Sequence, residues 1–291
     1  LHAHARCSEP GALSWLGRRI RLIVFDEAHQ AIAETYRRSV EAIATGGQPI
    51  TPIVGLTATP GRTFLGSDAD LQLAEFFHGN KVMLNTGAEG SDNPVRYLIE
   101  QEYLAEPTFE VLGELPEDPD AHGDEVSFGF EDDVALGMPK HDYLEATCGT
   151  ALELIAEGHR RIIVFAATVD LSHAAAAVLR SLGVMADPID GTTPSEIRDS
   201  VIRSYKAQTN TPRVLVNFGV LTTGFDAPQT SAVVIGRPTR SLVLYSQMVG
   251  RAIRGPKANG NRSAKIVTVV DPSVPAFGSI AAAFQNWEEL W

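Results

Sequence analysis

The stretch RIIVFAATVDLSHAAAAVLRSL, residues 161–182, decides the fold class. Its first part, Ile162 to Phe165, is an apolar run of the length expected for a strand. Its second part repeats apolar side chains at helical spacing, at Leu171, Ala175, Val178, Leu179 and Leu182. A strand followed at once by an amphipathic helix is the repeating unit of parallel sheets with crossover helices.

The same alternation continues after this stretch. Thr193 offers an N-cap hydroxyl, Pro194 suits the first helical position and Glu196 can close a capping box, so a helix is predicted here. Further strands are predicted at 214–218, 232–235 and 266–270, with a helix at 242–253 between the last two. We therefore predict a doubly wound α/β domain over residues 143–291.

Residues 1–85 show part of a second α/β unit. Apolar runs at 22–25 and 53–56 flank a helix whose apolar face carries Ile32, Tyr36, Val40 and Ile43. Between the two units, residues 86–142 lack sustained periodicity, and acidic residues concentrate from Glu114 to Asp133. This pattern predicts an acidic interdomain connector over 86–142.

Composition narrows the classes of function. The chain has 291 residues and a formal net charge of −12, which argues against nucleic-acid binding by a broad basic surface, so any such contact must be local. No apolar run approaches the roughly 18 residues of a membrane span, and no signal-peptide layout occurs, so we expect a cytoplasmic protein without a membrane partner. The two cysteines, Cys7 and Cys148, support neither a zinc site nor a disulfide framework.

Two carboxylates follow the first predicted strand directly, in LIVFDEAH, residues 22–29. Ligands of open α/β sheets lie beyond the carboxyl ends of the strands. At such a place one carboxylate can hold Mg²⁺, while the other orients or deprotonates the water that attacks a phosphoryl group. By themselves, Asp26 and Glu27 fit a polar strand end equally well.

Three further segments carry polar side chains. GLTATP, residues 55–60, is a strand that enters a hydroxyl-bearing turn, which could link the acidic site to a neighbouring domain or simply cap the strand. VLTTGFDAP, residues 220–228, is a turn with groups suited to a phosphate backbone or a ribose. On the helix predicted at 242–253, Gln247, Arg251 and Arg254 would share one face. The arginines there suit transition-state phosphate, or they form an ordinary basic surface or structural ion pairs.

Taken together, the order and spacing of these segments resemble the superfamily 2 helicases of the Asp-Glu-Ala-His class, related to the motor subunits of type I and type III restriction enzymes. In that family's terms, residues 26–29 are motif II, 57–59 motif III, 162–168 motif IV, 222–226 motif V and 247–254 motif VI. The resemblance covers nearly the whole chain except the connector. It implies an α/β fold of two RecA-like parallel-sheet lobes of the P-loop NTPase type, the first incomplete at its N-terminus.

The resemblance also implies roles for individual residues. Asp26 would bind Mg²⁺, Glu27 would activate water, and Arg251 and Arg254 would reach the γ-phosphate of ATP. The resemblance implies that His29 and Gln247 contact the nucleotide and couple its state to domain closure, that Gly224 contacts the nucleotide, and that Asp226 contacts the nucleotide or motif VI. It also implies relay between sites for Thr57 and Thr59, and contact with the nucleic-acid backbone for Gly191, Thr192, Thr222 and Thr223.

One part of the family's ATP site has no counterpart in the sequence. No Gly-x-x-x-x-Gly-Lys-Ser/Thr loop occurs, nor any Gly-Lys dipeptide. Because that loop lies upstream of motif II in the family, we expect the chain to begin after it and to be inactive alone.

We therefore hypothesise that the chain is part of an ATP-dependent helicase or translocase that moves on DNA rather than RNA. One alternative is a non-hydrolysing nucleic-acid-binding or regulatory module. Another is the motor portion of a restriction or phage-defence complex, with further subunits as partners.

Overall fold

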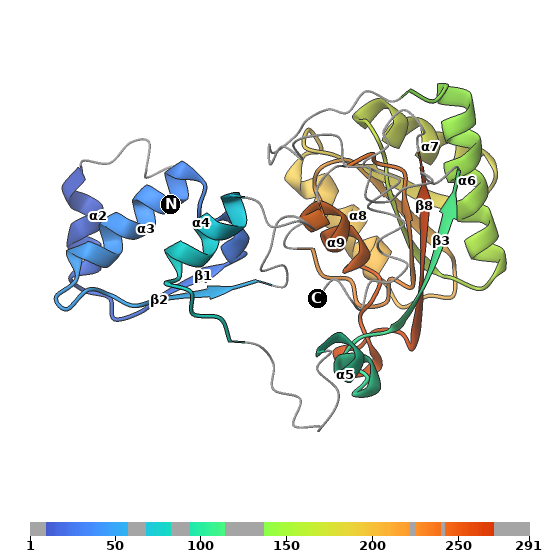
Figure 1. Cartoon of the computed structure of the whole chain (residues 1–291). Coiled ribbons are helices and arrows are strands. Elements are labelled where there is room, and N and C mark those ends of the chain that lie inside the picture. Colours follow the sequence, from blue (N-terminus) through green and yellow to red (C-terminus); the bar gives the residue numbers. More distant parts are fainter. Residues whose placement is uncertain are drawn as a thin grey trace. The chain divides into compact units, whose positions relative to one another are not determined.

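The computed structural model describes residues 10–57, 68–82, 94–113, 137–221, 225–239 and 242–270. The chain divides into two compact units, Leu1–Leu84 and Asn85–Trp291 (Figure 1). Both are built from parallel strands and helices, so the predicted α/β class is confirmed.

The first unit pairs two short parallel strands. In chain order it contains α2 (Pro10–Gly17), β1 (Ile23–Asp26), the 3-10 turn η1 (Ala28–Gln30), α3 (Glu34–Gly46), β2 (Ile53–Leu56) and α4 (Asp68–Phe76). Ile23 is in register with Ile53 and Asp26 with Leu56, so both strands end at the same edge. The three helices lie on one side of the strand pair (Figure 1).

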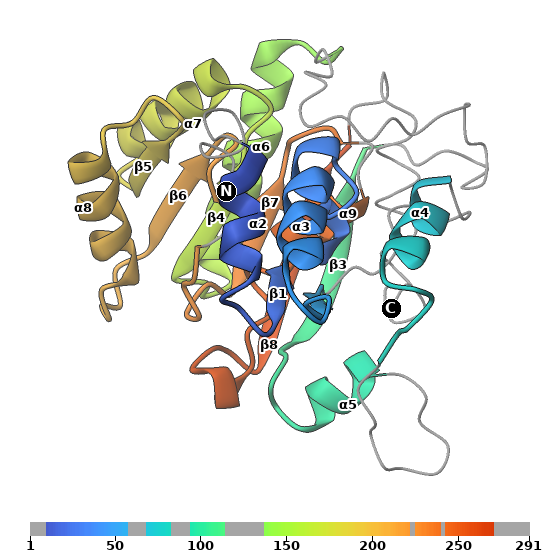
Figure 2. The same ribbon diagram turned by 90° about the vertical axis from the view of Figure 1, so that its left-hand side faces the viewer.

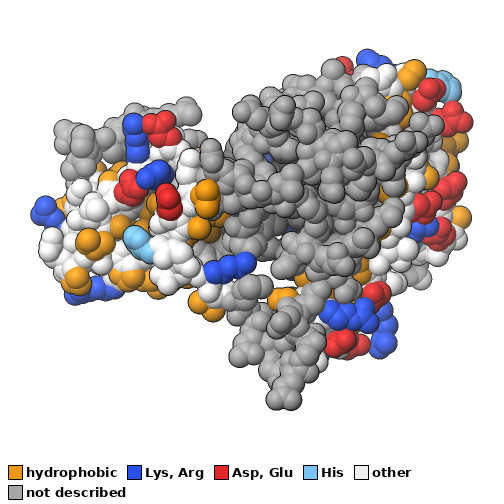
Figure 3. Space-filling model, viewed as in Figure 1, with side chains coloured by type: hydrophobic (Ala, Val, Ile, Leu, Met, Phe, Trp, Pro, Cys, Tyr) orange, Lys and Arg blue, Asp and Glu red, His pale blue; other side chains and the backbone are white. Residues whose placement is uncertain are grey.

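The strands of this unit alternate between half-buried and exposed residues. Ile23 and Phe25 are half-buried, whereas Val24 is 55% exposed, Val54 44% and Leu56 50%. Hydrophobic side chains are accordingly visible on the surface of this unit among charged ones (Figure 3).

The second unit contains a six-stranded parallel sheet in the order β3-β8-β7-β4-β6-β5. Figure 2 shows these strands spread side by side. The elements are α5 (Pro94–Glu100), β3 (Glu106–Leu112), α6 (Lys140–Ala156), β4 (Arg161–Phe165), α7 (Val169–Ser181), β5 (Met185–Ile189), α8 (Ser195–Lys206), β6 (Arg213–Asn217), β7 (Ala232–Ile235), α9 (Leu242–Val249), the 3-10 turn η2 (Pro256–Ala258) and β8 (Ser263–Val269).

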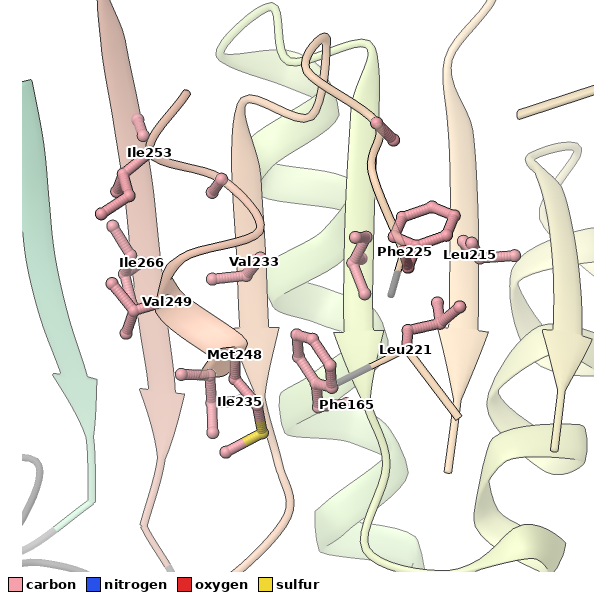
Figure 4. Packing of buried hydrophobic residues seen from close by; sticks show 14 of the residues in the cluster. Phe165, Leu215, Leu221, Phe225, Val233, Ile235, Met248, Val249, Ile253 and Ile266 are labelled. Carbon is pink, nitrogen blue, oxygen red and sulfur yellow. The ribbon is translucent and has the colours of Figure 1, made fainter. Parts of the chain in front are cut away.

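Helices cover both faces of this sheet. One apolar cluster joins α6 and α7 to the sheet through residues such as Leu154 and Leu179. On the other face, Tyr245 and Met248 of α9 pack with Phe165, Leu221 and Phe225 (Figure 4). Every residue of β4 and β7 is buried as a result. Buried strands between two helical layers are what a parallel sheet requires.

The structure corrects the predicted connector. Residues 94–112, placed in the connector from sequence, form α5 and β3, and β3 pairs along its whole length with β8. β5 also escaped prediction. Pro107 and Pro188 interrupt the apolar pattern of these two strands, and both strands lie at sheet edges, where a proline can be accommodated. The acidic stretch 114–133 lies outside the described residues.

None of the helices in the described part of the chain is both long and apolar enough to span a membrane.

Candidate functional site

The acidic residues of the first unit stand where β1 ends. The Asp26 side chain is exposed, and its Oδ1 accepts a hydrogen bond from the Glu27 amide at 3.0 Å. Glu27 has φ 54° and ψ 51°, in the left-handed region. This conformation costs a residue with a side chain about 1 kcal/mol or more, and such strain is found disproportionately at functional sites.

His29 joins this strand end to the neighbouring one. Its ring is buried, and Nδ1 lies 3.3 Å from Thr57 Oγ1 and 3.5 Å from Glu27 Oε2. Because β1 and β2 end side by side, Glu27 and Thr57 both follow carboxyl strand ends. The structure thus brings three of the singled-out residues together within one unit.

The end of β1 is compatible with Mg²⁺ held by one carboxylate together with phosphates and waters. Among the described residues, no group of three or more His, Cys, Asp or Glu side chains could hold a metal ion. Mg²⁺ bound to a nucleotide usually keeps several waters and takes one or two protein carboxylates, with phosphates as further ligands. The exposed carboxylate of Asp26 is consistent with that mode of binding.

The arginines of the second unit meet the segment before β7. Arg251 Nη1 donates to the carbonyl oxygen of Phe225. Arg254 Nε lies 3.7 Å from Asp226 Oδ1, and both of these side chains are exposed, at 45% and 66%. Two regions singled out in the sequence, 222–226 and 247–254, therefore contact each other.

The helical face predicted for these residues is wrong. α9 ends at Val249, and the amide of Arg251 bonds the carbonyl of Met248 at 3.2 Å in a tighter turn. Arg254 then pairs with Leu104 in an isolated antiparallel bridge, so tertiary pairing ends the helix early. Gln247 is half-buried on α9 and no longer shares a helical face with Arg254.

A segment not singled out from sequence holds Arg254 in place. We call Glu102–Ala105 the strap. The amide of Ala105 donates to the carbonyl of Ile253 at 3.0 Å, and the amide of Gly255 donates to the carbonyl of Tyr103 at 3.0 Å. A Cβ on Gly255 would lie 2.3 Å from the Glu102 carbonyl oxygen, so glycine is needed for this close approach. In the sequence, Gly255 is the feature that could have indicated this close contact.

A third group of residues gathers after β5, around Asp190. Its buried carboxylate accepts at Oδ1 from the Thr192 amide at 2.7 Å and from the Thr192 hydroxyl at 2.6 Å. Its Oδ2 lies 2.8 Å from His173 Nε2 on α7. Arg198 donates to the carbonyl oxygen of Asp190 at 3.0 Å. We call residues 190–193 the Asp190 turn.

These bonds keep Asp190 ionised. The Thr192 hydroxyl first, and then His173, lower the pKa of this carboxyl from 3.8 to about 2. They also change what the turn can offer a ligand. Both Thr192 donors are used inside the protein, contrary to the expected contact of a phosphate with its amide and hydroxyl. The space around Gly191 is open.

The turn after β6 begins beside the Asp190 turn, since the amide of Phe218 bonds the carbonyl of Ile189 at 3.1 Å. Four residues singled out from sequence lie outside the described residues: Thr59, Thr222, Thr223 and Gly224.

The six-stranded parallel sheet with helices on both faces gives the second unit a RecA-like α/β fold. More specifically, residues 146–256 match the helicase conserved C-terminal domain. That match begins within α6 and includes Arg251 and Arg254.

The chain is also similar to two curated proteins and to a solved structure. The chain is 25% identical over 237 residues to a 51.5 kDa protein of a Lactococcus phage (isolate 7-9), covering 81% of this chain and 47% of that protein. It is 25% identical over 239 residues to the Saccharomyces cerevisiae protein named ATP-dependent helicase IRC3, covering 81% and 32%. A fragment structure of an HsdR subunit of a type I restriction enzyme from Vibrio vulnificus YJ016 has a similar fold, with a TM-score of 0.64 at 22% identity, covering 96% of this chain and 47% of that one.

These findings confirm the resemblance to superfamily 2 helicases and the RecA-like fold. The chain spans less than half the length of the two curated relatives.

Proposed function

We propose that the chain is part of a DNA-dependent helicase or translocase that hydrolyses ATP with Mg²⁺. The observation that carries this proposal is the contact of Arg251 and Arg254 with Phe225 and Asp226 inside a helicase C-terminal domain. A planar guanidinium suits the charge that develops on a transferred phosphoryl group.

The first unit would supply the acidic half of the reaction. Asp26, exposed at the end of β1, would hold the metal, and Glu27 would orient or deprotonate the attacking water. The hydrogen bond between Thr57 and His29 would link this strand end to the next one, with Thr59 continuing the relay. When bound, ATP supplies the phosphoryl group and Mg²⁺ neutralises part of its charge.

The second unit would supply positive charge. Arg254 is exposed and its backbone is fixed by the strap, so its guanidinium can contact a phosphate without reorganisation of the chain. Gln247 and His29 would couple the nucleotide state to closure, with Gly224 and Asp226 beside the nucleotide. The residues 1–85 and 143–291 are proposed as the first and second helicase domains.

Nucleic acid would bind locally, consistent with the net charge of −12. Gly191, Thr222 and Thr223 are the proposed backbone contacts. DNA is the proposed substrate because of the resemblance to restriction-enzyme motors. The fold similarity to an HsdR subunit also supports partner subunits of a restriction or defence complex.

A second candidate is a nucleic-acid-binding or regulatory module without turnover. The sequence favours it in one respect, because it contains no Gly-x-x-x-x-Gly-Lys-Ser/Thr loop.

The test is ATP hydrolysis by the whole protein with single-stranded DNA, duplex DNA or RNA, beside a Glu27→Gln variant. Turnover that DNA stimulates and Glu27→Gln abolishes would support the helicase proposal. Nucleic-acid binding without turnover would favour the module. Turnover unchanged by Glu27→Gln would refute the role of the acidic strand end.

A further inference from the structure

His173 has an unusual position for a surface histidine. Its side chain is 55% exposed, yet Nε2 lies 2.8 Å from a carboxylate that is only 1% exposed. A carboxylate accepts but cannot donate when ionised, so the proton between them belongs to His173 Nε2. The other ring nitrogen, Nδ1, lies on the far side of the ring, and no residue in the described ranges is bonded to it.

The Asp190 turn has few other donors to offer. The amide and hydroxyl of Thr192 are directed at Asp190, and Thr193 Oγ1 accepts from the Asp190 amide. The amide of Thr193 is also used, because it donates to the carbonyl oxygen of Asp190. A phosphate that approached this turn would therefore meet the buried charge of Asp190 without a donor from either threonine amide or from the Thr192 hydroxyl. A Cβ on Gly191 would meet no atom within 4 Å, so the turn is open there, and the neighbouring imidazole of His173 is 55% exposed.

We propose that His173 binds a phosphate of the nucleic-acid strand, with Asp190 holding its imidazolium in place. This inference rests on the nucleic-acid binding proposed above. In the neutral ring, Nδ1 would be an acceptor and would repel a phosphate oxygen. Once the ring takes up a proton from solvent, Nδ1 donates to the phosphate while Nε2 continues to donate to Asp190. Strand binding and uptake of one proton are therefore linked.

The charges around the ring favour its imidazolium form. α7 packs against α6, β5 and β6. The side chains that α6 and β6 turn toward α7 are apolar, including Cys148, Val214 and Val216. β5 contributes Asp187, which is bound by Arg180 at 3.0 Å, and leads into Asp190. Asp170 lies one turn earlier on α7, and Arg198 of α8 bonds backbone carbonyls of the turn.

The position in the sheet favours a strand phosphate over ATP. The Asp190 turn follows the carboxyl end of β5. Arg254 pairs with Leu104 before β3 begins, and Asp226 precedes β7, so both belong to the amino end of the sheet. A five-residue strand is about 17 Å long, too far for one phosphate to touch both places.

The experiment measures fluorescence anisotropy of a labelled single-stranded DNA, about 20 nucleotides long, with the whole protein at about pH 6 and about pH 8. We expect the wild type to bind about three- to tenfold more tightly at the lower pH. His173→Gln keeps a donor for Asp190 but cannot become charged, so its affinity should change much less. Its salt dependence at the lower pH should also fall by about one ion.

The matched control is His141→Gln on α6, whose side chain is 84% exposed. It should follow the wild type at both pH values, and His173→Ala should lose affinity at the lower pH as His173→Gln does. Equal pH and salt dependence in wild type and His173→Gln would overturn this inference alone. No binding by the wild type at either pH would overturn the proposed nucleic-acid binding and the inference together.

Discussion

The two parallel sheets are supported differently. In the second unit, β4 and β7 are buried along their whole length between two layers of helices. In the first unit, every second residue of β1 and β2 is exposed, and the described helices lie on one side (Figure 1). The apolar contacts that fix a parallel strand are thus on two faces in one unit and on one face in the other.

This difference shows how each unit holds its polar residues. Arg254 is fixed by backbone bonds to the strap and lies in a domain with an extensive core. Glu27 has a left-handed backbone conformation, and its carboxylate lies near His29, which in turn contacts Thr57. The sheet of this unit has two strands. The second unit should therefore tolerate local change at its site better, and suffer more from changes in its core.

The largest contrast should come from one substitution made in both sheets. Leu215→Ala in β6 removes a side chain with 0% exposure and should destabilise the second unit by about 2–5 kcal/mol, because it leaves a cavity. Leu56→Ala in β2 removes one with 50% exposure and should cost the first unit about 1 kcal/mol or less. Hydrogen exchange of each unit's strand amides measures both losses. Equal losses would contradict the contrast.

The next largest loss of stability is expected at the strap. Gly255→Ala places a Cβ against the Glu102 carbonyl and should cost about 1–3 kcal/mol, with faster exchange of the Ala105 and Gly255 amides. Gly149→Ala in α6 is the control, because a Cβ there meets nothing within 4 Å. It should stabilise the chain by about 0.5–1 kcal/mol. Unchanged exchange at the strap in Gly255→Ala would show that Arg254 is held otherwise.

Acid should weaken the second unit through Asp190. Since the folded-state pKa is lowered from 3.8 to about 2, the ionised carboxylate contributes its full stabilisation above about pH 4 and loses it as the pH falls through about 2. At about 1.4 kcal/mol per pKa unit, the contribution is about 2 kcal/mol.

Urea unfolding of wild type and Asp190→Asn between about pH 6 and about pH 3 measures it. The gap between the two proteins should narrow toward low pH. Asp187→Asn on the same edge strand, where Arg180 lies 3.0 Å away, is the control. A gap that stays constant with pH would mean that Asp190 is not linked to folding in this way.

The smallest effect concerns Glu27. Glu27→Asn should stabilise the first unit by about 0.5–1 kcal/mol, since asparagine tolerates the left-handed region better. The same change should abolish the proposed activation of water. Hydrogen exchange of β1 and β2 would report the first effect. A destabilised first unit would mean that Glu27 contacts matter more than its backbone strain.

The sequence predicted the central strands well and the edge strands poorly. The strand predicted at 232–235 coincides with β7, because a fully buried parallel strand is a continuous apolar run. β3 and β5 were missed because edge strands accept proline and polar residues, and only pairing with β8 and β6 shows them to be strands. Local pattern carries no information about that pairing.

The site residues divide in the same way. The strand-end position of Asp26 and Glu27 follows from a pattern within eight residues. The helix through Arg254 was predicted from spacing, but the bridge to Leu104, 150 positions earlier, ends it. The bond between His173 and Asp190 likewise depends on how α7 returns beside β5, which no short pattern encodes.

The central claim of the proposed function is that both units contribute to one hydrolysis reaction. Its most direct test is DNA-stimulated ATP hydrolysis by the whole protein with Arg254→Lys, beside Arg262→Lys as a control on a side chain that is 87% exposed. Arg254→Lys should lower turnover by about 10³-fold, because lysine lacks the planar donors of an arginine finger, while Arg262→Lys should match the wild type. Full turnover in Arg254→Lys would contradict the claim.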